Sequence, residues 1–65
     1  MRELVKIIDN NRSALIRGDG GSYFLDLCED DVLVETIVFN EHTLTIVEKQ
    51  GYNWVNNEQI VRPTV

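Results

Sequence analysis

The sequence predicts an all-β domain: a small antiparallel sheet of five to six strands, closed into a barrel or bent into a curved meander. Two observations predict this fold. Turn-forming Gly, Asn and Asp residues recur at short, nearly even intervals, and the segments between them are rich in Val, Ile, Thr, Tyr and Phe. A chain of 65 residues is too short for two full sheets. Closure into a barrel would also remove exposed strand edges.

Six segments are predicted as strands, and the strongest turn signal separates the second from the third. Asp19-Gly20 favours a two-residue hairpin turn, because Asp and Gly tolerate positive φ at its centre. In the third segment Tyr23, Leu25 and Leu27 alternate with the other residues, as in a half-buried strand. The six segments are residues 4–8, 13–17, 22–28, 32–39, 43–49 and 60–62.

The segment 32–39 is compatible with two structures. Val32, Thr36 and Phe39 would lie along one side of a helix that begins near Asp30 and Asp31. However, β-branched residues are dense in this segment, and their restricted side-chain rotamers favour a strand. We predict a strand, with a helix as the open alternative for residues 30–39.

The end of the chain resembles the closing segment of SH3-like barrels. There an aromatic strand is followed by a polar 3₁₀ turn and a short last strand, an order matched here by Tyr52 and Trp54, then residues 56–57, then residues 60–61. The resemblance covers about the last fifth of the chain and implies barrel topology. It does not imply polyproline binding, because the aromatic, acidic N-terminal motif and the paired tryptophans of peptide-binding SH3 domains are missing.

Length and composition indicate one domain over residues 1–65. The chain is 43% apolar and 26% charged, unlike a disordered tract or a membrane protein. Its first residues resemble neither a signal peptide nor a transit peptide, so we expect a cytoplasmic protein. So small a domain has a thin core and little room for a deep active site.

Catalytic, metal and cofactor sites are not indicated. Cys28 is the single cysteine, and the acidic residues that follow it disfavour a reactive thiolate. His42 is the single histidine and has no nearby cysteine with which to complete a zinc site. We therefore expect no enzyme activity, no metal and no cofactor.

Charge is distributed unevenly along the chain. The net charge is -5, yet residues 18–48 contain eight acidic residues and no Lys or Arg, whereas both flanking segments are mildly basic. Carboxylates facing each other across paired strands cost up to about 1 kcal/mol, so stability alone would not select this pattern. A hairpin centred on residue 30 would gather five carboxylates at one end of the sheet: Asp26, Glu29, Asp30, Asp31 and Glu35.

The sequence therefore favours a non-enzymatic protein-interaction module. Its acidic patch would bind a protein with a basic surface, and Tyr52 and Trp54 would form a weaker, aromatic site. By analogy, a phage or bacterial regulator could dock in this way on a nucleic-acid-handling protein. The alternative for the same residues is a solvated hairpin tip that keeps the protein soluble.

Two other functions remain open. The first is a structural or assembly subunit that forms a homo-oligomer through its strand edges. The second is a nucleic-acid binder that uses the basic residues near the N-terminus together with Tyr52 and Trp54. The negative net charge opposes the second function, because it repels phosphate.

Overall fold

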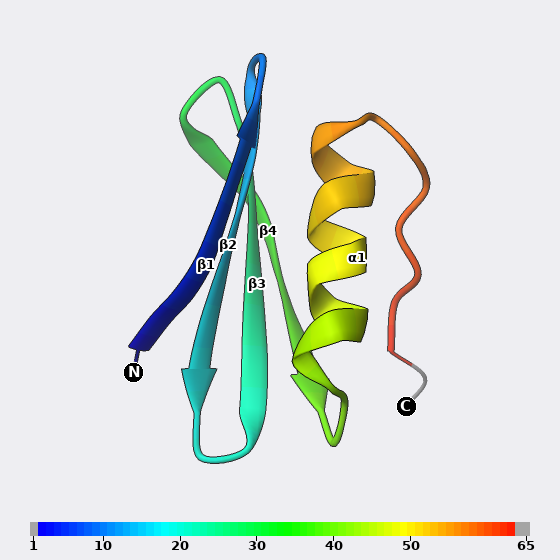
Figure 1. Ribbon diagram of the computed structural model, residues 1–65. Coiled ribbons are helices and arrows are strands. Elements are labelled where there is room, and N and C mark those ends of the chain that lie inside the picture. Colours follow the sequence, from blue (N-terminus) through cyan, green and yellow to red (C-terminus); the bar gives the residue numbers. More distant parts are fainter. Residues whose placement is uncertain (1, 64–65) are drawn as a thin grey trace.

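The computed structural model describes residues 2–63 as four antiparallel strands followed by one helix. The strands pair in chain order and form an open meander sheet. The helix packs on one face of this sheet, and the residues after it run back along the helix (Figure 1). The elements are β1 (Arg2–Asp9), β2 (Arg12–Asp19), β3 (Ser22–Glu29), β4 (Val32–Asn40) and α1 (Leu44–Val55).

The predicted all-β barrel is wrong, and the fold is α+β. Within residues 2–63 the sheet stays open, with β1 and β4 at its two edges. The first four predicted strands are confirmed, including 32–39, for which a helix was the alternative. Residues 43–49 were predicted as a strand but belong almost entirely to α1, and residues 60–62 are not in a strand. The resemblance to SH3-like barrels therefore fails, because Tyr52 and Trp54 lie on a helix.

Helix α1 begins after Thr43, whose hydroxyl accepts a hydrogen bond from the Ile46 amide at 3.4 Å. This is the usual capping contact at a helix start. Val47, Gly51 and Val55 recur every four residues and are all buried. The β-branched residues of this segment favour a strand weakly, and burial of the apolar stripe outweighs that preference.

The core lies between α1 and the face of the sheet that α1 covers. At Gly51 the two layers come very close: a Cβ there would lie 3.0 Å from Ile7 Cδ1 and 3.3 Å from Ala14 Cβ. Glycine therefore permits the approach of helix and sheet. The buried apolar residues are Ile7, Ala14, Ile16, Leu25, Leu27, Ile37, Phe39, Val47 and Val55.

The turns between strands use left-handed backbone conformations. Gly20 and Gly21, with φ of 57° and 86°, form the β2–β3 turn, one residue later than the predicted Asp19-Gly20. Asp30 and Asp31 form the β3–β4 turn with φ of 53° and 64°. Left-handed φ is costly for residues with a Cβ, so the second of these turns is strained.

Both edge strands contain an irregularity in pairing. The β1–β2 register shifts at Leu4 and the β3–β4 register shifts at Val34, whereas the β2–β3 register is continuous. Such bulges interrupt the row of backbone groups that a neighbouring strand would need for pairing. The two edges are therefore poorly suited to pairing with another sheet.

The residues that follow α1 are tied to the helix and to β4. Buried Gln50 accepts a hydrogen bond from the Val61 amide at 2.7 Å through Oε1. Arg62 donates two hydrogen bonds to the Glu35 carboxylate. These hydrogen bonds, together with the charge of Glu35, raise the pKa of Arg62 above its ordinary value.

Candidate interaction surface

The five carboxylates predicted to form an acidic patch lie in three separate places. Asp26 lies between the buried Leu25 and Leu27 on β3, so it points to the sheet face opposite α1. Glu35 pairs with Leu27 and therefore points to the helix side. Glu29 also lies on the helix side, near the end of α1. Asp30 and Asp31 occupy the exposed tip of the β3–β4 hairpin.

Three of these carboxylates are paired with arginines from outside the acidic stretch. Arg17 pairs with Asp26 through two nitrogens: its Nε lies 2.8 Å from Asp26 Oδ2, and its Nη2 donates to Oδ1 at 3.0 Å. Thr36 also donates a hydrogen bond to Asp26, at 2.7 Å. Three of the five carboxylates of the predicted acidic patch are thus paired with cations in the fold. The pairs are Arg17–Asp26, Arg12–Glu29 and Arg62–Glu35.

Tyr52 and Trp54 do not form one aromatic site. Two residues apart on a helix, they point in directions about 200° apart. Tyr52 is exposed, whereas Trp54 is half-buried and donates a hydrogen bond from Nε1 to the Cys28 carbonyl at 3.1 Å. The Arg12 guanidinium lies 4.0 Å from the centre of the indole ring. Trp54 therefore joins α1 to the sheet, and of these two residues only Tyr52 is exposed.

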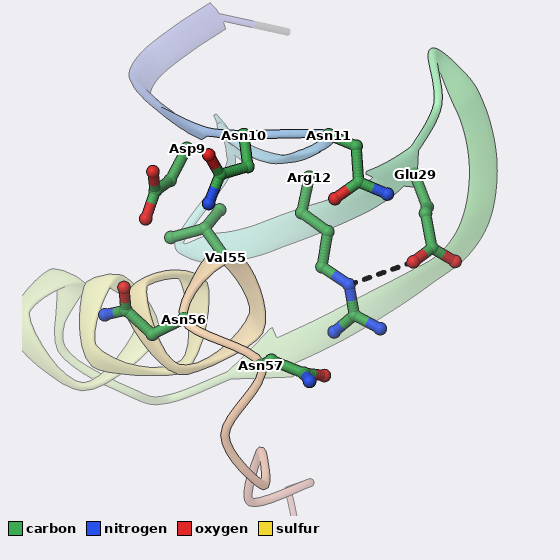
Figure 2. Close-up of a pocket in the computed structure, with 8 residues that line it drawn as sticks. All are labelled: Asp9, Asn10, Asn11, Arg12, Glu29, Val55, Asn56 and Asn57. Carbon is green, nitrogen blue, oxygen red and sulfur yellow. Dashed lines mark hydrogen bonds and ion pairs between the residues drawn. The ribbon is translucent and has the colours of Figure 1, made fainter.

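A polar cleft of about 350 Å³ lies between the β1–β2 turn and the C-terminal end of α1 (Figure 2). Residues 10–11 and residues 56–57, all asparagines, line it together with Asp9 and Val55. The Arg12–Glu29 ion pair, with Nε and Oε2 3.2 Å apart, lies beside them (Figure 2). Arg12 also donates a hydrogen bond to the Trp54 carbonyl at 3.1 Å. Arg12 thus connects the sheet to the end of the helix.

The sheet face opposite α1 is not covered by any other element of residues 2–63 (Figure 1). Its cross-strand neighbours form three rows of four side chains, which we name the helix-free face. Half of these side chains are apolar, and they include the exposed Ile8 (65%), Leu33 (57%) and Val38 (41%). The rows are Glu3–Arg17–Phe24–Val38, Lys6–Leu15–Asp26–Thr36 and Ile8–Ser13–Cys28–Leu33.

The charges on the helix-free face are balanced. The three rows carry the carboxylates Glu3 and Asp26 and the cations Lys6 and Arg17, so their formal charge is zero on a chain of net charge -5. Asp19, at the end of β2, lies outside these rows on the same side of the sheet. The Arg17 guanidinium lies 5.6 Å from the centre of the Phe24 ring. The three rows therefore form a mixed apolar and polar surface whose charges balance.

A signal for this face is present in the strands and was missed by the sequence analysis. Apolar residues run without alternation through residues 14–16, 23–25 and 37–39. Such runs are typical of strands that are buried on both faces, whereas a strand that faces water on one side alternates. Only one of the two faces is covered by α1.

Comparisons with protein-family models, curated proteins and solved structures found no match to this chain. Within residues 2–63, no three or more His, Cys, Asp or Glu side chains are grouped so that they could hold a metal ion. In the same part of the chain, no helix has the length and apolar character needed to cross a membrane.

Proposed function

We propose that the protein is a non-enzymatic protein-interaction module that docks through its helix-free face. The observation that carries this proposal is that the strands have apolar side chains on both faces of the sheet, whereas α1 covers only one face. Leu15, Phe24 and Val38 alternate with core residues on the same strands, yet α1 covers only the core side. Apolar side chains left exposed on an uncovered sheet face favour an interaction site there.

The composition of the face favours a protein as the partner. A nucleic-acid site needs an excess of Lys and Arg with exposed aromatic rings, whereas Lys6 and Arg17 are matched here by two carboxylates. Assembly through strand edges is disfavoured by the bulges at Leu4 and Val34. The face of the sheet is thus a better candidate contact than its edges.

Docking of the acidic residues on a basic partner is a second, narrower proposal. The observation in its favour is that Asp30 and Asp31 are exposed at one hairpin tip. Asp30 Oδ1 accepts a hydrogen bond from Asn11 at 3.3 Å, so the neighbouring hairpin supports this tip. If the tip is the contact, the double change Asp30→Asn and Asp31→Asn abolishes partner capture at low salt, whereas Ile8→Glu does not.

The main proposal is tested by capture of partners from an extract of the native host. Ile8→Glu places a charge on the helix-free face at a side chain that is 65% exposed, so the core is not disturbed. We expect at least a tenfold loss of captured partner, which corresponds to about 1.4 kcal/mol. Ile46→Glu is the matched control, because Ile46 is exposed on α1, away from this face. Equal capture by the wild type and Ile8→Glu would contradict the proposal.

A further inference from the structure

We infer that the partner seated on the helix-free face is a second copy of this chain, packed face to face about a two-fold axis. The inference rests on the proposed function and names its partner. Two identical chains of net charge -5 repel each other over most of their surface. On the helix-free face, by contrast, each copy presents two carboxylates and two cations, so the copies can meet there without that repulsion.

Charge also selects the direction of the two-fold axis. An axis perpendicular to the strands, through the row that contains Lys6 and Asp26, would stack each of these residues on its own copy. Like charges placed opposite each other are destabilising. This arrangement is therefore disfavoured.

An axis parallel to the strands, between β2 and β3, lays β1 of one copy over β4 of the other. Ile8 then faces Leu33 of the second copy, and two exposed apolar side chains cover each other. Lys6 then lies over Thr36 of the second copy, which is the cross-strand neighbour of Asp26. Lys6 is thus offset sideways from that Asp26 by one strand spacing, about 4.8 Å. Arg17 and Asp26 also lie one strand spacing from their own copies, but no charged residue stacks directly on its own copy, as Lys6 and Asp26 do about the perpendicular axis. The parallel axis is therefore the one we propose.

The size of the face fits a specific dimer. Strands of eight residues are about 26 Å long, and four strands side by side span about 19 Å, which gives a footprint of about 500 Å². Side-chain relief raises the accessible area above this footprint. Specific interfaces begin at about 600 Å² for each partner, so the flat footprint lies just below this size and side-chain relief must supply the remainder. Stacking would place the two sheets about 10 Å apart, with α1 on each outer side.

Light scattering coupled to gel filtration tests the inference. At about 100 μM the wild type is expected to have twice the 7.5 kDa mass of one chain, and Ile46→Glu to have the same mass. Ile8→Glu and Leu33→Lys are expected to have the mass of one chain, with circular dichroism spectra that match the wild type. The inference is overturned if the wild type has the mass of one chain up to about 1 mM, or if Ile8→Glu stays dimeric.

Cross-linking tests the direction of the axis. With Cys28 replaced by Ser, chains that carry Ile8→Cys are mixed with chains that carry Leu33→Cys and treated with a short bis-maleimide. The parallel axis predicts cross-linked pairs in the mixture and none with either chain alone. The perpendicular axis instead predicts that Leu15→Cys chains cross-link to one another. A monomeric wild type overturns the inference but leaves the proposed function to the capture experiment, so the two failures can be distinguished.

Discussion

At the scale of single residues, the β3–β4 turn contains the clearest local conflict between sequence and conformation. Asp31 has φ of 64°, a conformation that glycine adopts without steric cost. We expect Asp31→Gly to raise the free energy of unfolding by about 1 kcal/mol, and the melting temperature by about 4–8 °C. Asp19→Gly is the matched control, because Asp19 ends β2 without positive φ. Destabilisation by Asp31→Gly in urea titration would contradict this reading of the turn.

Arg12 is the residue through which the sheet and the helix end are joined. One guanidinium pairs with Glu29, donates to the Trp54 carbonyl and lies over the Trp54 ring. A lysine ammonium cannot make all three contacts at once. We expect Arg12→Lys to lower the free energy of unfolding by about 1–2 kcal/mol, with Arg2→Lys, at an exposed site, close to neutral. Urea titration measures both, and equal values would contradict the assigned role of Arg12.

At the scale of elements, the close contact between α1 and the sheet depends on Gly51. A valine there would add a Cβ within 3.0 Å of Ile7 Cδ1, with further methyl groups beyond it. We expect Gly51→Val to cost about 2 kcal/mol or more, because an overpacked contact must move helix and sheet apart. Thr45→Val is the control, since it places the same side chain on an exposed helical site. Chemical denaturation gives both values, and a near-neutral Gly51→Val would contradict the close packing.

The four strands could be predicted from sequence, and the helix could not, for an identifiable reason. Turn residues and alternation mark the strands locally, and these local signals agree with the tertiary structure. In residues 43–49, Thr43, Thr45, Ile46 and Val47 favour a strand, yet the Thr43 cap and the spacing of Val47, Gly51 and Val55 belong to a helix. Packing against the sheet favours the helix over the strand in this segment, and local propensity does not predict that packing.

The predicted site residues lie apart because of a bulge in β4 and because their arginine partners come from distant parts of the chain. The bulge at Val34 sets which β4 residues share a face with β3, and it left Glu35 and Asp26 on opposite faces. The arginine partners of the carboxylates come from β2 and from the segment after α1, up to 27 residues away in sequence. Neither the bulge nor these partners can be read from local spacing.

At the scale of the whole molecule, folding brings basic residues from both ends of the chain onto part of its acidic middle segment. Both mildly basic ends of the chain place arginines on carboxylates of the acidic middle, in three ion pairs. What the fold leaves uncovered is instead the neutral, half-apolar side of its sheet. A second copy of the chain would cover the helix-free face, as α1 covers the opposite face of the sheet.

The most direct test of this account is the rate at which Cys28 is alkylated, because its thiol lies on the helix-free face. In the wild type we expect the rate to fall at least tenfold between about 1 μM and about 100 μM protein, as the dimer covers the face. Ile8→Glu should react at one rate at both concentrations. A wild-type rate that is independent of concentration, and equal to that of Ile8→Glu, would contradict the account.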